Sequence, residues 1–129
     1  MPAILCDIHG TLLDDNNKPI IPIIEIITRH IGYDILLITA GDYTYTKNLR
    51  DLKYLLDSCD INYNELFVAK ETYLFKYNYS DDYIKAAIYR TQIQDKHSIV
   101  LTIDNNKDCF KMWRKYGLDS LRFGAGKSE

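Results

Sequence analysis

Short apolar runs alternate with helix-like segments along this chain, and that alternation restricts the fold more than any other feature. The apolar runs cover Ala3–Asp7, Ile35–Thr39, Leu66–Ala69 and Ser98–Ile103. Continuous apolar runs of this length are typical of strands that are covered on both faces. Because a helix-like segment follows each run, the pattern predicts an α/β fold with a parallel sheet and right-handed crossovers.

Apolar residues at helical spacing predict four helices between and after these runs. The first extends from Ile23 to Gly32, and the other three have their buried stripes at Leu49–Leu56, Ile84–Ile88 and Phe110–Trp113. In the last of these we expect Phe110 to face inward together with Trp113. A final strand is expected within Leu118–Phe123.

Composition excludes several classes of protein. The 129 residues hold 16 Lys+Arg and 18 Asp+Glu, so the net charge of -2 excludes a strongly basic, nucleic-acid-wrapping protein. A 47% hydrophobic content argues against disorder, and the length predicts a single domain over residues 1–129. The three cysteines form no C-x-x-C pair, which argues against a zinc site or a disulfide framework. With no apparent leader or membrane-spanning run, we expect a cytoplasmic protein, and phage or viral encoding stays open.

Three of the predicted strands end in polar residues: Asp7, Thr39 and Asp104. In open parallel sheets, ligands bind beyond the carboxyl ends of the strands. Two carboxylates that meet there repel each other unless a cation or a proton lies between them, and an all-oxygen site suits Mg²⁺. Asp residues at strand ends also cap turns. From the strand positions alone, a turn-capping role for these residues is about as well supported as a metal site.

The same positions carry motifs that resemble those of the haloacid dehalogenase superfamily. Residues Asp7–Leu12 (DIHGTL) resemble its D-x-D-G-T-L nucleophile loop, Ile38–Thr39 its second motif, and Ile103–Asp108 its acidic fourth motif. The resemblance implies a Rossmann-like three-layer sandwich. The gaps between the motifs are too short for a lid, so we expect no cap domain and an open site.

A closer similarity is to the 3′-phosphatase domain of phage-type polynucleotide kinase-phosphatases, and it is concentrated in the second half of the chain. It rests on Asp81–Lys85 (DDYIK), on Ile103–Asn105 and on Met112–Gly117 (MWRKYG). The resemblance implies hydrolysis of a phosphate ester, with a polynucleotide 3′ end or a nucleotide as the substrate. No stable protein partner can be inferred from it.

The resemblance also implies roles for individual residues. Asp7 would be the nucleophile that forms an aspartyl-phosphate, Thr39 and Lys85 would contact the phosphate, and Asp81 would hold Lys85 four residues away on one helix face. The remaining residues expected to bind substrate are Gly10, Thr11 and Ala40, the first two through backbone N–H groups of the loop after Asp7. The expected residues of the Mg²⁺ site are Asp7, His9 through its carbonyl, Asp104, Asn105 and Asp108.

Three departures from the family pattern keep other functions open. His9 stands where the family has its general acid–base Asp, Asn105 replaces a second Asp, and Gly41 stands where phage-type phosphatases have an Arg. A histidine titrates near neutrality and is able to move the same protons. The alternatives are a catalytically impaired protein that binds nucleic acid or a protein, and a phosphatase of small metabolites.

Overall fold

The computed structural model describes residues 2–123, which form a single sheet with helices packed against it. The strands are β1 (Pro2–Asp7), β2 (Asp34–Ile38), β3 (Glu65–Phe67), β4 (Ser98–Asp104) and β5 (Ser120–Arg122). The helices are α1 (Ile21–Arg29), α2 (Thr46–Ser58), α3 (Tyr73–Lys76), α4 (Asp81–Ile88) and α5 (Lys107–Lys115). A π-helical turn, η1 (Tyr89–Ile93), continues α4.

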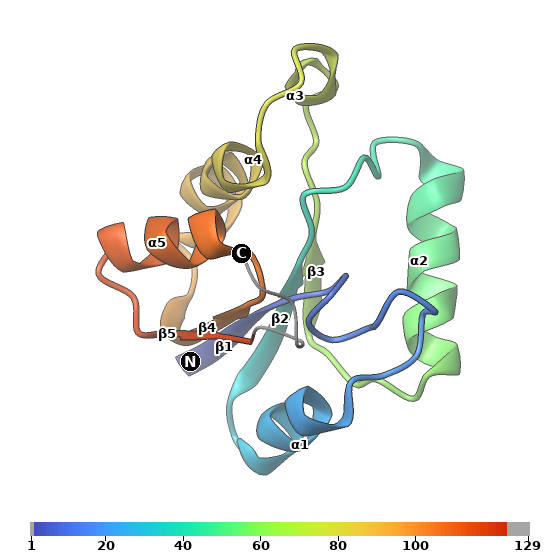
Figure 1. Cartoon of the computed structure of the whole chain (residues 1–129), viewed down its shortest axis with the longest axis vertical. Helices are drawn as coiled ribbons and strands as arrows, with labels where there is room; N and C mark the ends of the chain where they lie inside the picture. Colours follow the sequence, from blue (N-terminus) through green and yellow to red (C-terminus); the bar gives the residue numbers. More distant parts are fainter. Residues whose placement is uncertain (1, 124–129) are drawn as a thin grey trace.

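The sheet has the strand order β3-β2-β1-β4-β5, and all of its strand pairs are parallel. β1 lies at the centre and pairs with β2 and β4, so Leu5 lies beside Leu36 on one side and Thr102 on the other. The predicted parallel α/β fold is therefore confirmed. Within residues 2–123, no segment forms a separate cap over the sheet, as the short gaps between the motifs predicted (Figure 1).

Alternation along the central strands builds a core on each face of the sheet. Leu5 and Leu36 pack on the face that α4 and α5 cover, with Ile84 and Trp113. Ile4, Cys6, Ile35 and Leu37 pack on the opposite face, which α1 and α2 cover with Ile23, Leu52 and Leu56. Because both faces are covered, the strands read as continuous apolar runs, and the three-layer sandwich is confirmed.

One predicted burial and one predicted strand end differ from the structure, and one short helix was not predicted. In α5 the buried residues are Cys109, Met112 and Trp113, while Phe110 is only half-buried. Cys109 precedes the other two by three and four residues, so these three side chains share a helix face that excludes Phe110. β3 ends at Phe67, before the predicted Ala69, and the short helix α3 was not predicted.

No helix in the described part of the chain is both long and apolar enough to cross a membrane.

Candidate functional site

Two carboxylates meet at the carboxyl ends of neighbouring strands. Asp7 is the last residue of β1 and Asp104 the last residue of β4, and these strands pair in parallel with Cys6 beside Ile103. Both side chains are buried, with residue exposures of 6% for Asp7 and 1% for Asp104. The parallel pairing thus forces two acidic groups together in a dry environment, which is unfavourable unless positive charge lies between them.

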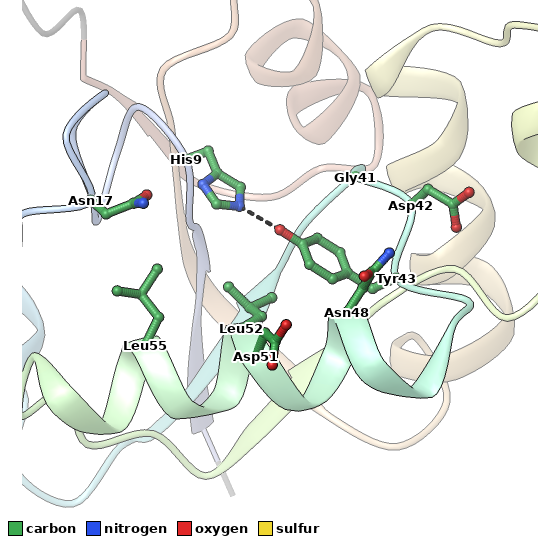
Figure 2. Close-up of a pocket in the computed structure, with 9 residues that line it drawn as sticks. All are labelled: His9, Asn17, Gly41, Asp42, Tyr43, Asn48, Asp51, Leu52 and Leu55. Atoms are coloured by element: carbon green, nitrogen blue, oxygen red, sulfur yellow. Dashed lines mark hydrogen bonds between the residues drawn. The ribbon is translucent and has the colours of Figure 1, made fainter.

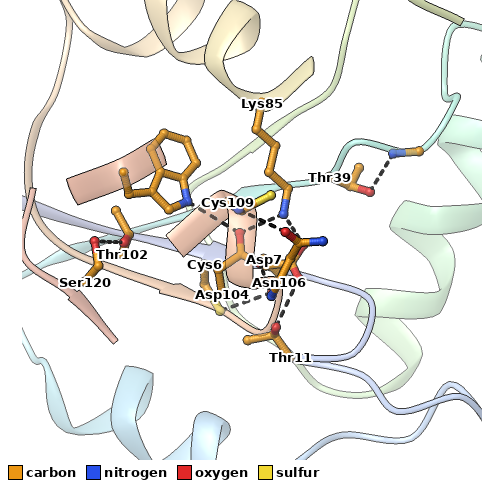
Figure 3. A network of polar contacts seen from close by, with 12 residues as sticks. Cys6, Asp7, Thr11, Thr39, Lys85, Thr102, Asp104, Asn106, Cys109 and Ser120 are labelled. Atoms are coloured by element: carbon orange, nitrogen blue, oxygen red, sulfur yellow. Dashed lines mark hydrogen bonds and ion pairs between the residues drawn. The ribbon is translucent and has the colours of Figure 1, made fainter. Parts of the chain in front are cut away.

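Lys85 supplies that positive charge from α4. Its Nζ donates to Asp7 Oδ1 at 2.9 Å and to Asp104 Oδ2 at 2.7 Å, and the residue is only 2% exposed (Figure 3). α4 packs on this face of the sheet through Ile84 and Ile88, and this packing carries Lys85 to the strand ends. The cluster Asp7–Lys85–Asp104 is called the charged triad below.

Further donors satisfy every carboxylate oxygen of the charged triad. Thr11 Oγ1 donates to Asp7 Oδ2 at 3.0 Å. The backbone N–H of Asn106 donates to Asp104 Oδ1 at 3.0 Å, and Trp113 Nε1 donates to Asp104 Oδ2 at 3.4 Å. Each of the four oxygens accepts at least one hydrogen bond, which fixes the orientation of both carboxylates.

Burial and the neighbouring opposite charges shift the pKa values of Asp7 and Lys85 in opposite directions. Burial raises the pKa of Asp7 from 3.8 to about 6, and Asp104 adds to the rise while Lys85 opposes it. Burial lowers the pKa of Lys85, but the two carboxylates outweigh it and the net pKa is above its usual range. Lys85 is therefore a permanent cation here. Burial also raises the pKa of Cys6 and Cys109, which keeps these thiols protonated and argues against a nucleophilic role.

The loop after Asp7 is closed on itself. The N–H groups of Thr11 and Leu12 both donate to the carbonyl of Ile8, at 3.2 and 2.8 Å, and the N–H of Gly10 donates to Leu13. The N–H groups of Gly10 and Thr11 are therefore engaged inside the loop, and Thr11 reaches Asp7 through its hydroxyl. Gly10 has a φ of +82°, and a Cβ at this position would collide with the Asn105 side chain. Only glycine suits this conformation and this close approach.

A pocket of about 340 Å³ opens above the triad and gathers most of the predicted residues. It is lined by Asp7, His9, Thr39, Ala40, Gly41, Asp81, Lys85, Asn105 and Asn106. Of these, Gly41 and Asn106 were not predicted as binding residues. Asn106 also caps α5, because its Oδ1 accepts a hydrogen bond from the N–H of Cys109 at 2.9 Å. An Asn directly before a helical pattern is the sequence signal that marks this residue.

Two predicted residues lie differently from expectation. The structure does not pair Asp81 with Lys85: Asp81 is exposed at the start of α4, and the Lys85 ammonium lies on Asp7 and Asp104 instead. The buried carboxylates offer Lys85 stronger, less hydrated partners than a surface carboxylate does. Asp108 is exposed in the first turn of α5 and does not line the pocket.

His9 lies at the rim of this pocket, and its partner was not foreseen. Its Nε2 lies 2.9 Å from Tyr43 Oη, and the two rings are nearly parallel, with an interplanar angle of 9°. Partial burial and the charge of Lys85 both lower the pKa of His9, which favours neutral imidazole. Tyr43 follows the second motif in an irregular loop, and no spacing or motif marks it in the sequence.

The raised pKa of Asp7 predicts a pH-dependent stability in metal-free buffer. Folded Asp7, with a pKa of about 6 against 3.8, holds its proton more tightly than the unfolded chain does. Protonated Asp7 therefore stabilises the fold fully below pH 3.8, and this stabilisation is lost as the pH rises through about 6. We expect Asp7→Asn to remove this loss, so that the variant gains stability relative to the parent above pH 6. Urea denaturation in EDTA on both sides of that pH measures the difference, and parallel pH dependences in the two proteins would contradict it.

A sequence model described as the polynucleotide kinase PNKP phosphatase domain matches residues 7–127. No curated protein matches the chain in sequence.

Two of the solved structures that share the fold align with nearly the whole chain. They are titled "Structure of Pnkp1/Rnl/Hen1 complex" and "Structure of the Pnkp1/Rnl/Hen1 RNA repair complex", and each has a TM-score of 0.77. Their identities to this chain are 20% and 21%, and each alignment covers 95% of this chain but only 45% and 42% of the respective solved chains. The chain thus spans less than half the length of those proteins.

The family match begins at Asp7, the acidic residue that ends the central strand, and runs through the whole described site. The predicted resemblance to haloacid dehalogenase-type phosphatases is confirmed, and the chain belongs to the family of polynucleotide kinase PNKP phosphatase domains.

Proposed function

We propose that the chain is a Mg²⁺-dependent phosphomonoesterase that removes phosphate from a polynucleotide 3′ end or from a nucleotide, with Asp7 as its nucleophile. The observation that carries the proposal is the buried Lys85 ammonium, 2.9 Å from Asp7 and 2.7 Å from Asp104 beneath a 340 Å³ pocket. Family membership supports the reaction class, and the lack of a cap over the described sheet supports a large substrate.

The acidic groups of the site fit a hard divalent cation. Asp7 and Asp104 bring two negative charges against the single positive charge of Lys85, which leaves one uncompensated negative charge in a buried place. Mg²⁺ is usually held by one or two carboxylates together with waters and substrate phosphate, so the absence of a larger His, Cys, Asp or Glu cluster within residues 2–123 does not conflict with it. Asp7, Asp104, Asn105 and the His9 carbonyl would hold the ion, which when bound would neutralise phosphoryl oxygens.

The proposed reaction proceeds in two steps on Asp7. An ionised carboxylate oxygen attacks phosphorus while the bond to the leaving oxygen breaks, which gives an aspartyl-phosphate. His9 in its protonated form gives a proton to the leaving oxygen, and the neutral imidazole that remains takes one from the water that hydrolyses the aspartyl-phosphate. Because the pKa of His9 is lowered, the protonated form is the minority near neutral pH. With the pKa of Asp7 at about 6, the attacking form prevails above that pH.

Thr39 and Lys85 are proposed to bind the phosphoryl oxygens. Thr39 Oγ1 accepts a hydrogen bond from the N–H of Gly41 at 3.1 Å, which leaves its own hydroxyl proton available to donate to substrate. The Lys85 ammonium lies beside Asp7 on the wall of the same pocket. Both groups are held before substrate arrives, and such preorganised donors stabilise charge in the transition state most effectively.

A second candidate function rests on His9. The His9 ring is exposed and hydrogen-bonded to Tyr43. In this second candidate the chain is catalytically impaired and binds nucleic acid without turnover. Because both similar structures are multi-protein complexes, a protein partner is also part of the proposal. A phosphatase of small metabolites is the third candidate, and substrate preference separates it from the first.

Asp7→Asn tests the proposal directly. We expect Mg²⁺-dependent release of phosphate from 3′-phosphorylated oligonucleotides, and we expect Asp7→Asn to abolish it because the amide cannot attack phosphorus. Phosphate release is measured with Mg²⁺ and with EDTA, on oligonucleotides, nucleoside monophosphates and an aryl phosphate. Asp95→Asn, an exposed carboxylate outside the site, is the matched control and should keep full activity. Full turnover by Asp7→Asn would refute the proposal, and silence of the parent protein on every substrate would favour the binding function.

Substitutions of His9 test its proposed proton transfers. His9→Asn keeps the main-chain carbonyl but removes the titrating group, so we expect turnover to fall by roughly 10²- to 10⁴-fold. His9→Asp restores the family's carboxylate and should raise turnover or shift its pH profile. The measurement is the pH dependence of kcat for the three proteins, and superimposable profiles would show that His9 takes no part.

A further inference from the structure

A second cavity adjoins the catalytic pocket. Its volume is about 410 Å³, and it extends from His9 and Gly41 along the side of α2 (Figure 2). His9 and Gly41 line both cavities. If the phosphorus lies at Asp7 and His9 protonates the leaving oxygen, as proposed above, the second cavity is where the rest of the leaving group can extend.

Gly41 creates the junction between the two cavities. A Cβ at this position would lie 2.9 Å from Tyr43 Cε2, closer than carbon atoms approach in real contacts. The absence of a side chain thus lets the Tyr43 ring lie at the entrance, where it is held parallel to His9 and bonded to it through Oη. Gly41, which departs from the family pattern, thus allows the Tyr43 ring to lie beside the proposed leaving-group position.

The lining of the second cavity is aromatic, apolar and rich in hydrogen-bond acceptors. Leu52 and Leu55 form apolar wall on α2, and Asn48 and Asp51 of the same helix add an amide and a carboxylate (Figure 2). Asp51 is only loosely paired, with its Oδ2 3.8 Å from Lys47 Nζ. None of the described residues that line this cavity is a lysine or an arginine.

These properties select the class of ligand. A flat ring finds a stacking partner in Tyr43, and its amino or hydroxyl groups find acceptors in Asp51 and Asn48. The lining offers a second phosphate carboxylates and no lysine or arginine, so the cavity suits a base and sugar, and a longer substrate would keep its phosphodiester outside it. The volume lies within the range of cavities that enclose small organic ligands.

We propose that the second cavity binds the base and sugar of the nucleoside that carries the scissile phosphate, with Tyr43 as the stacking residue and Asn48 and Asp51 as polar contacts. This rests on the proposed function, because it takes the catalytic pocket as the phosphate site. The cavity then determines specificity: a phosphate attached to a nucleoside is preferred over the same phosphate on a sugar without a base.

The test compares two substrates that differ only in the base: a deoxynucleoside 3′-monophosphate and the corresponding abasic sugar 3-phosphate. Stacking on an aromatic side chain contributes enough for a preference of roughly 5- to 150-fold in kcat/KM. We expect this preference in the parent protein, and we expect Tyr43→Ala to bring the ratio close to one. Asn48→Ala, on the exposed side of α2, should reduce the ratio without affecting the core.

Two control variants separate stacking from other effects of Tyr43. Tyr43→Phe keeps the ring but removes the bond to His9, so it should keep the preference for a base even where kcat changes. Tyr45→Ala removes an exposed tyrosine of the same loop that does not line the cavity, and it should behave like the parent. A parent protein that turns over both substrates equally, or variants of Tyr43 and Asn48 that all keep the parent ratio, would overturn the proposal.

Binding of the free nucleoside distinguishes failure of this inference from failure of the proposed function. If no substrate is hydrolysed, the proposed function fails, and deoxyadenosine is then titrated into the protein and followed by NMR chemical shifts. Shifts at the cavity that vanish in Tyr43→Ala would support the nucleoside site on their own. No shift at millimolar nucleoside would overturn it.

Discussion

The Lys85 ammonium between Asp7 and Asp104 is the interaction on which the rest of the structure depends. The parallel order of β1 and β4 brings two carboxylates into a buried corner, and neither is tolerable there without a positive partner. Removing one partner from a buried ion pair typically costs about 3–5 kcal/mol, because the remaining charge is left uncompensated. The position of α4 over the sheet is therefore tied to the chemistry of the strand ends.

The same arrangement fits the proposed reaction on a phosphate ester. Its carboxylate oxygens are all hydrogen-bonded, so Asp7 is oriented before a substrate binds. One negative charge remains uncompensated, which favours a divalent cation. The raised pKa of Asp7 has burial as its main cause. Two of the three residues that differ from the family, His9 and Gly41, line both cavities. In the proposed reaction this is the side of the leaving group, where proton transfer and specificity are decided.

The sequence predicted the elements of this site better than its contacts. Asp7, Thr39 and Asp104 end apolar runs, so their meeting at one edge follows from parallel topology alone. The expected partner of Lys85 was wrong, because helical spacing makes Asp81 an obvious neighbour, while the observed partners Asp7 and Asp104 are 78 and 19 residues away. Tyr43 could not be foreseen: its position depends on an irregular loop and on the space left by Gly41. Predicting that Cys109 is buried and Phe110 is not would have required the rotation of α5 about its own axis.

The central claim is that Asp7 itself carries the phosphoryl group during turnover. The most direct measurement is chemical trapping with a 3′-phosphate substrate that is radiolabelled in its phosphate, followed by acid quench, proteolysis and mass spectrometry of the labelled peptide. We expect label on Asp7 in the parent protein and none in Asp7→Asn, whose amide cannot attack phosphorus. Release of phosphate with no label on Asp7 under single-turnover conditions would contradict the claim.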